Sequence, residues 1–141
     1  MIKNMAVIPK EKLIRFEDYH GTLVIIYPYL PPSKNKYIRS HWASQQKRFF
    51  KPWRNWFIGE YVSQPLTRCF NGPVRVTIQL FFPDNRRRDA MNYASFPPLL
   101  DTLVEAKIIE DDNSAMCDLA ILPPIVDGTS TMILTVNAQG K

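Results

Sequence analysis

The chain has 141 residues, of which 45% are hydrophobic and 12% aromatic, and this is enough for one globular domain with a hydrophobic core. The formal net charge of +5 favours a polyanionic partner: nucleic acid first, and an anionic membrane surface second. The longest apolar run, residues 23–30, is far too short to span a bilayer, and residues 1–20 do not resemble a signal peptide. We therefore expect a cytoplasmic protein with no membrane partner.

The cysteine and histidine residues give no sign of a metal site or a disulfide framework. Cys69 and Cys117 lie far apart in the sequence, without Cys-x-x-Cys spacing and without a nearby histidine. We interpret both as ordinary thiols. His20 and His41 are isolated, so a surface or capping role is expected for each, although His41 could also meet a nucleic acid.

The first predicted strand begins after Gly21. Residues 1–20 have no strong period and are expected to form an extra arm or strand before a domain that covers residues 21–141. The run TLVIIYPYL is rich in β-branched and aromatic residues and ends at two prolines, which predicts a strand that leads into a turn. Its continuous apolar character predicts burial on both faces. The basic residues 34–39 that follow are predicted to form a loop.

Residues 42–61 are predicted to be helical. Aromatic residues recur there at three- and four-residue spacing and define one face of the helix. They are Phe49, Trp53, Trp56, Phe57 and Tyr61. Pro52 is expected to kink this helix or to start a second one. Aromatic residues interleaved with cations could form a stacking platform for single strands, but aromatics at helical spacing belong more often to a core, and we favour the core.

Residues 73–82 show the clearest strand pattern, because apolar residues alternate along them with other residues. One face is predicted to carry Val74, Val76, Ile78, Leu80 and Phe82. A loop and a helix are expected next, interrupted at Pro97 and Pro98, so that Phe96 is predicted to be non-helical or kinked. Beyond this break, an apolar helical stripe is predicted at Leu99, Leu100, Leu103, Val104 and Ile108.

Two further strands are predicted near the C-terminus. The segments CDLAIL and TMILTV have strand character, and PPIVDGTS between them carries Pro-Pro and Asp-Gly signals that suit a hairpin loop. The predicted order is strand, helix, strand, helix, strand, strand. This order predicts an α+β fold in one domain, with two main helices packed on a mixed four-stranded sheet.

The densest positive charge of the chain stands close to its densest negative charge. Three arginines, Arg86, Arg87 and Arg88, precede Asp89, and the cluster Glu110, Asp111 and Asp112 follows at the end of the same stretch. An arginine run alone is usually a solvated face, and an acidic run alone is usually a turn. Together, cations that contact phosphates and carboxylates that hold a divalent metal are the plan of a metal-dependent nuclease site.

Two segments carry a resemblance to a known family. The residues PDNRRRDAMNY, followed by LLDTLVEAKIIEDDN, resemble the core of the RusA family of Holliday junction resolvases, which includes many phage-encoded members. Upstream, LPPSKNKYIR resembles the segment that follows the first strand of that family. Both matches occur in the order of the family and at about its spacing. The resemblance covers residues 21–136.

The resemblance implies a set of site residues in this chain. Catalytic roles fall on Asp89 and Asp112, with Asp111 beside Asp112, and the same Asp89 and Asp112 would hold Mg²⁺, or Mn²⁺ in its place. DNA-binding roles are assigned to Arg86, Arg87, Arg88, Asn92, Lys34, Asn35, Lys36, Arg39, Lys47 and Arg48. The family carries a second Asp where this chain has Met91, and it carries a lysine that has no counterpart in residues 93–98. The resemblance further implies a homodimer that binds four-way DNA junctions without a small-molecule cofactor, in a bacterial or phage-infected cell.

The chemistry of magnesium is compatible with few protein ligands. Mg²⁺ prefers oxygen ligands and commonly binds through one or two carboxylates, while waters and phosphate oxygens complete its coordination. A helix from Asp89 to Asp101 would separate these residues by about 18 Å, so Asp101 is interpreted as a helix-surface charge. Asp89 and Asp112 can share a site only if the chain breaks at the two prolines, or if a partner subunit brings one of them. The sequence leaves both routes open.

Three functional hypotheses follow. The first is a Mg²⁺-dependent endonuclease that resolves Holliday junctions or other branched DNA in recombination and repair. The second is a junction-binding protein on the same fold with weak or no cleavage. Met91 and the missing lysine favour this hypothesis. The third is a basic RNA- or single-strand-binding domain that uses the aromatic helix as its platform.

Overall fold

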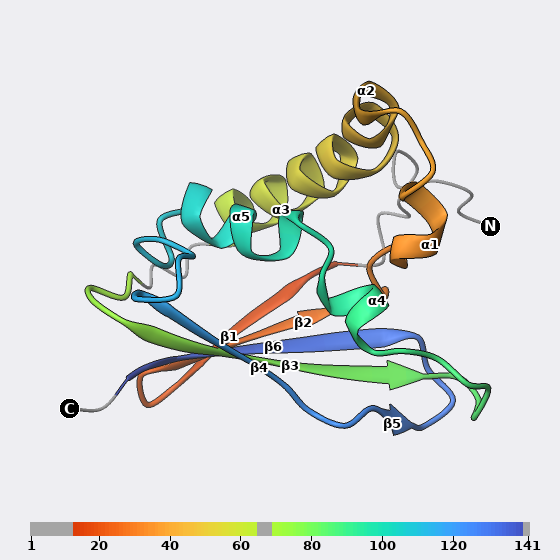
Figure 1. Ribbon diagram of the computed structural model, residues 1–141. Helices are drawn as coiled ribbons and strands as arrows, with labels where there is room; N and C mark the ends of the chain where they lie inside the picture. Colours follow the sequence, from red (N-terminus) through yellow and green to blue (C-terminus); the bar gives the residue numbers. More distant parts are fainter. Residues whose placement is uncertain (1–12, 65–68, 140–141) are drawn as a thin grey trace.

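The computed structural model describes residues 13–64 and 69–139. Its centre is a sheet of six strands in the order β1-β2-β6-β3-β4, with β5 paired to β3 (Figure 1). The strands are β1 (Arg15–Tyr19), β2 (Thr22–Tyr27), β3 (Val74–Phe82), β4 (Cys117–Ile121), β5 (Ile125–Val126) and β6 (Thr131–Ala138). The helices are α1 (Lys34–Tyr37), α2 (Trp42–Gln45), the π-helical turn η1 (Gln46–Phe50), α3 (Lys51–Ser63), α4 (Met91–Ala94) and α5 (Pro98–Glu105).

The predicted α+β class is confirmed, but the sheet has six strands instead of four. The additional strands are β1, which pairs with β2, and the short β5, which pairs with β3. The sheet is mixed, because β4 and β5 run parallel to β3, whereas β6 runs antiparallel to it. Of the arm predicted at residues 1–20, residues 1–12 lie outside the described part of the chain.

The predicted hairpin between the last two strands is wrong. β4 and β6 lie on opposite sides of β3, so the segment between them passes around the end of β3 and does not join neighbouring strands. The physical reason is the helix before β4. A strand that follows a crossover helix aligns parallel to the strand before that helix, and β4 therefore occupies one side of β3. The other side remains for β6.

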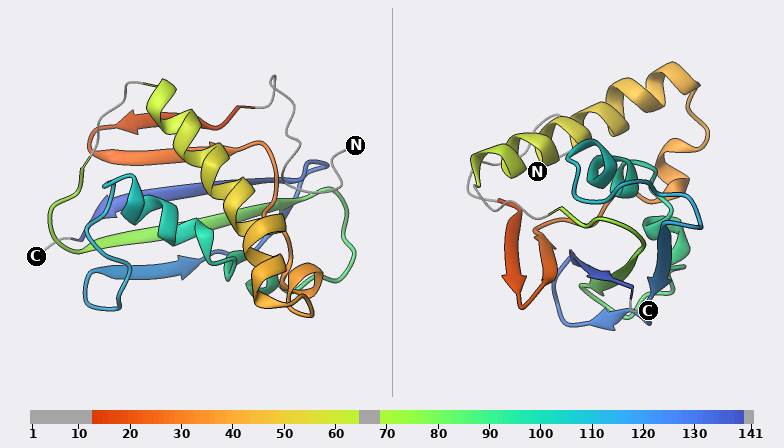
Figure 2. Two further views of the ribbon diagram at one scale, coloured as in Figure 1. Left: turned by 90° about the horizontal axis from the view of Figure 1, so that it is seen from above. Right: turned by 90° about the vertical axis from the view of Figure 1, so that its left-hand side faces the viewer.

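The helices cover one face of the sheet and leave the other uncovered, as the two views of Figure 2 show. Burial therefore alternates along the strands. In β3 the predicted inward set, Val74, Val76, Ile78, Leu80 and Phe82, is buried. β2 was expected to be buried on both faces, but only Leu23, Ile25 and Tyr27 are fully covered. That expectation failed because, within residues 13–64 and 69–139, no second layer covers the opposite face of β2.

Aromatic residues form the centre of the core. Trp53 of α3 is fully buried and lies 5.6 Å from the ring of Tyr27 and 5.3 Å from the ring of Phe96, measured between ring centroids. The predicted aromatic face is confirmed, since Phe49, Trp53 and Phe57 are buried and Trp56 and Tyr61 pack against them. Pro52 stands in the first turn of α3, directly after η1.

The break predicted near residue 97 separates α4 from α5. Phe96 lies outside both helices, as predicted, and is 1% exposed. Pro98 begins α5, whose predicted stripe packs inward: Leu99 and Leu103 are buried, as is Ile108 beyond the helix end. Leu100 and Val104 are partly buried against the same core. In the described residues, no helix is long and apolar enough to cross a membrane.

Candidate DNA-binding surface and carboxylates

The two segments that resemble the RusA family contact each other. Residues 34–37 form the one-turn helix α1, so the predicted loop is wrong at this point. The ring of Tyr37 anchors this turn, because it packs against Phe50 at 5.3 Å and against Phe96 at 5.7 Å between centroids. Side-chain packing thus overrides the weak helix preference of so short a segment. As a result, α1 lies beside α4, which directly follows the arginine run (Figure 1).

This packing gathers exposed cations from three segments, and we call them the basic surface. Its members are Lys34, Lys36, Arg39, Lys47, Arg48, Arg86 and Arg87, all of them exposed. Lys47 and Arg48 directly precede Phe49 and Phe50, whose rings contact Tyr37. Asn35 is also exposed, whereas Asn92 is half-buried. The predicted DNA-binding residues therefore come from one end of the molecule.

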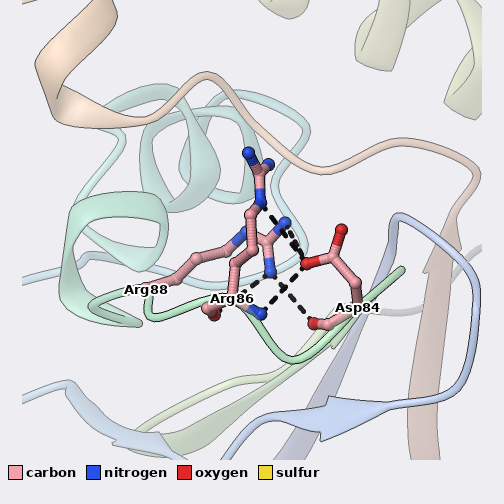
Figure 3. A network of polar contacts seen from close by, with 3 residues as sticks. All are labelled: Asp84, Arg86 and Arg88. Carbon is pink, nitrogen blue, oxygen red and sulfur yellow. Dashed lines mark hydrogen bonds and ion pairs between the residues drawn. The ribbon is translucent and has the colours of Figure 1, made fainter.

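The three arginines have different surroundings, as Figure 3 shows for two of them. The side chain of Arg88 is only 10% exposed. It contacts Oδ1 of Asp84 at 2.9 Å, donates to the carbonyl oxygen of Asp84 at 3.1 Å and lies 4.9 Å over the ring of Phe82. Arg86 is 77% exposed and reaches Asp84 at 3.4 Å. For Arg87, the described residues provide no hydrogen-bond or ion-pair partner.

Asp84 organises this loop. The backbone N–H of Arg86 donates to Oδ1 of Asp84 at 3.1 Å, and this bond is the main reason why the pKa of Asp84 lies below its usual range. The hydrogen bond from Arg88 lowers the pKa further. Because the guanidinium of Arg88 contacts Asp84 and Phe82, its N–H groups stabilise the loop and do not face a ligand. Arg86 and Arg87 are the arginines with free surface for a phosphate.

Asp89 follows the arginines on the exposed surface. Its Oδ1 accepts a hydrogen bond from the backbone N–H of Met91 at 3.0 Å, which fixes the carboxylate at the start of α4. Met91 is 51% exposed, so its thioether is no part of the core. A carboxylate at position 91 would therefore be solvated.

The second acidic group lies around Asp112. Asp101 is exposed on α5, as predicted, but its carboxyl group forms a hydrogen bond with Asp112. Partial burial raises the pKa of Asp101, and so do the negative charge of Asp112 and this hydrogen bond. Asp111 accepts the backbone N–H of Asp112 at 2.7 Å. Burial and the nearby carboxylates of Asp112 and Asp118 also raise the pKa of the Cys117 thiol.

The segment after α5, which carries Asp112, and the loop after β3, which carries Asp89, lie toward opposite ends of β3 (Figure 1). The charge of Asp112 raises the pKa of the Cys117 thiol, so Asp112 lies near Cys117. Cys117 pairs with Val74 at the start of β3. Asp89 follows the loop at the other end, where Arg88 covers Phe82. The nine residues of β3 span about 26 Å. The break before α5 does not close this separation.

Asp89 and Asp112 do not belong to one cluster of acidic side chains within the described part of a single chain. Within residues 13–64 and 69–139, no group of three or more His, Cys, Asp or Glu side chains could hold a metal ion. Asp89 and Asp112 are suitable oxygen donors individually, but they are separated. Of the two routes that the sequence leaves open, approach from a partner subunit is the one compatible with this geometry.

The histidines and cysteines have the ordinary surroundings that their isolation in the sequence predicts. Nδ1 of His41 accepts the backbone N–H of Ala43 at 3.2 Å and caps α2, which confirms a capping role. His20 has a positive φ of 54° in the exposed turn between β1 and β2. Cys69 and Cys117 are both free thiols.

One exposed aromatic residue is not identified by the sequence patterns. Trp42, the first residue of α2, is 69% exposed beside the basic surface. The aromatic spacing that identified the core residues does not include it. Its position directly after Arg39 and two polar residues was the available signal.

Comparison with known proteins gives no family assignment. No family model matches the chain, and no curated protein matches it. A solved structure from Salmonella typhimurium, provisionally described as a translation initiation inhibitor, has 14% sequence identity and a TM-score of 0.31. The alignment covers 94% of this chain and 95% of the other. At this TM-score, the likeness carries no argument about function.

Proposed function

We propose that this chain is a RusA-like, Mg²⁺-dependent endonuclease that acts on four-way or other branched DNA as a homodimer, in recombination and repair. The observation that supports this best is the packing of α1 against α4. It sets α1, which carries Lys34 and Lys36, against α4, which follows Arg86, Arg87 and Asp89 in the chain. The ring of Tyr37 also contacts Phe49 and Phe50, which follow Lys47 and Arg48. A carboxylate bordered by cations suits a phosphate backbone that must be both held and attacked.

The basic surface provides the affinity in this proposal. Lysine and arginine side chains that neutralise phosphates release condensed counterions, and binding therefore weakens steeply as salt rises. The cations lie on short helices and a loop, which Tyr37 and Asp84 hold in place. Such a surface recognises the DNA backbone more than the base sequence.

The carboxylates provide the metal ligands across two subunits. In the proposed dimer, Asp89 of one subunit and Asp112 of the other, with Asp111 next to it, would hold Mg²⁺ or Mn²⁺. The bound metal would supply a Lewis acid that activates water and stabilises charge on the phosphate. Asp89 is held in position for this role by the N–H of Met91, and Arg86 and Arg87 orient the backbone.

The outer edge of β4 is a suitable surface for the second copy. β4 is the last strand of the sheet, and within the described residues nothing pairs with its outer edge. Large apolar residues are exposed along β4, β5 and their connection: Leu119, Leu122, Ile125 and Val126 are 39%, 40%, 45% and 52% exposed. The opposite edge, β1, carries Arg15, Glu17 and Asp18, and such charges block edge pairing.

Antiparallel pairing of β4 with its copy would also bring the separated ligands closer. A twofold axis between β4 and its copy, level with the middle of the strand, sets Cys117 of one copy against Ile121 of the other. The residues before Cys117 would then extend toward the end of β3 that carries Phe82 and, beyond it, Asp89. Because the β4 strand of the second copy runs in the opposite direction, its Asp112 would lie toward the end of β3 near Asp89 of the first copy.

A second candidate function keeps the binding and omits the cleavage. Met91 stands where the family has an acid, and the ligands within one chain are separated, which favours a junction-binding protein with weak or no nuclease activity. The third hypothesis receives less support, because Phe49, Trp53 and Phe57 of its predicted platform are buried in the core.

Binding and cleavage assays separate these functions. A labelled synthetic junction is competed with linear duplex, single-stranded DNA and RNA, and cleavage is followed with Mg²⁺ or Mn²⁺. The proposal expects preference for the junction and metal-dependent nicks. Preference without nicks supports the second candidate, whereas stronger competition by single strands or RNA contradicts both.

A further inference from the structure

Trp42 is an exposed aromatic residue in a basic stretch of the sequence. It is 69% exposed, whereas Trp53 is fully buried and Trp56 is partly buried. Ile38, one helical turn earlier in the chain, is 49% exposed. Arg39 lies between Ile38 and Trp42 in the sequence, and Lys47 follows Trp42 by five residues; both cations are exposed.

The backbone around Trp42 is held by local hydrogen bonds. His41 caps α2 through its Nδ1 atom, and its carbonyl oxygen accepts the N–H of Gln45 at 2.9 Å. The side chain of Gln45 donates to the carbonyl oxygen of Ser40 at 3.0 Å. Behind this turn, Tyr37 packs into the core. Trp42 is thus presented from a fixed turn, so little conformational entropy is lost when it binds.

We propose that Trp42 stacks on an unpaired or unstacked base at the branch point of the bound DNA. This inference rests on the proposed function, since the cations must first place the backbone beside α2. An indole ring stacks on any base, because every base has an aromatic face. A linear duplex keeps its bases paired and stacked, whereas a branch point can expose one. Trp42 would therefore contribute to selection of branched over linear DNA.

The choice of a base over a protein surface comes from charge. Trp42 lies between two exposed cations in the sequence, Arg39 and Lys47, which attract phosphate, and Ile38 adds only a small apolar area. A protein interface usually has an apolar centre depleted of charged residues. Contact between two copies through Trp42 is the alternative, and sedimentation without DNA would detect it.

The test compares Trp42→Ala, Trp42→Phe and Trp42→Leu with Val62→Ala, which removes another exposed apolar side chain, in α3, that is 75% exposed. Affinity is measured for a four-way junction and for a linear duplex of the same sequence. 2-Aminopurine at the branch point reports stacking, because its fluorescence falls when it stacks. We expect Trp42→Ala and Trp42→Leu to bind the junction about tenfold more weakly and to lose the quenching. Trp42→Phe should keep most of both.

Other results overturn the inference and locate the failure. Equal losses of affinity for junction and duplex, with unchanged quenching of 2-aminopurine, would show that Trp42 contacts the DNA backbone and not a base. A changed sedimentation coefficient without DNA would assign it to a contact between copies. If the wild-type chain prefers the junction and Trp42→Ala does so equally, only the stacking is wrong. If the wild-type chain shows no preference for the junction, the proposed function fails as well.

Discussion

The ring of Tyr37 packs edge to face against the ring of Phe96, with centroids 5.7 Å apart and an angle of 62° between the planes. This contact joins α1 to the segment between α4 and α5. The cations of the basic surface repel one another, so they do not hold the surface together. Its geometry depends on this aromatic contact in the core.

Removal of the Tyr37 ring should therefore affect both stability and binding. Tyr37→Ala is expected to lower the free energy of unfolding by about 3 kcal/mol, as for other large aromatic truncations, and to weaken junction binding. Tyr37→Phe keeps the ring but loses the hydrogen bond with Ser95, for an expected cost of about 1 kcal/mol. Urea denaturation and junction titration measure both quantities. Wild-type stability of Tyr37→Ala would contradict the packing described.

The arginines should separate into a binding residue and a structural one. Arg87→Ala is expected to reduce the salt slope of junction binding by about one charge without a change in stability. Arg88→Ala removes the contacts with Asp84 and Phe82, so it should destabilise the loop and lower the melting temperature. Salt titrations and thermal melts of both variants, with Arg15→Ala at the β1 edge as control, provide the comparison. Identical behaviour of Arg87→Ala and Arg88→Ala would contradict this division.

The Asp101–Asp112 pair predicts a specific pH dependence. The folded-state pKa of Asp101 is raised, so between its unfolded and folded pKa values the folded state binds more protons. Stability from this group is thus full below the unfolded pKa and is lost as pH rises through the folded pKa. Asp101→Asn should stabilise the protein at pH 7 by about 0.5 kcal/mol, given solvent screening, and lose this advantage near pH 3. A pH-independent difference in melting temperature would exclude the repulsion.

Local sequence patterns predicted most of the fold. The alternation in residues 73–82 and the aromatic spacing in residues 42–61 each reflect one covered face, and both were confirmed. Strand order could not be read in this way. The Asp-Gly signal before β6 indicates a turn, but whether that turn joins neighbouring strands depends on the side of β3 that β4 already occupies.

The candidate site was harder to predict than the fold. Sequence spacing grouped Arg86, Arg87 and Arg88 as equals, but the buried contacts of Arg88 depend on Asp84 and on the ring of Phe82. Proximity of Asp101 to Asp112 depends on how the chain turns after α5, which the residue types do not specify. The distance between Asp89 and Asp112 follows from the length and direction of β3 relative to β4.

A composite metal site predicts complementation between two inactive variants. Asp89→Asn and Asp112→Asn should each abolish cleavage while junction binding is kept or strengthened, because less negative charge faces the phosphates. When the two variants are mixed and exchange subunits, half of the sites in each mixed dimer combine the intact Asp89 with the intact Asp112. About half the wild-type activity per mixed dimer is expected. No recovery after verified subunit exchange would show that the ligands do not come from different subunits.

Cleavage of a four-way junction by the wild-type chain and Met91→Asp tests the central claim most directly. Because Met91 is exposed, the new carboxylate stays solvated, and the fold should tolerate it. It also adds a hard oxygen ligand where a thioether cannot serve Mg²⁺. The account predicts Mg²⁺-dependent nicks in paired strands of the junction and none in linear duplex, with more cleavage by Met91→Asp. A stably folded Met91→Asp that cleaves neither substrate, like the wild-type chain, would contradict it.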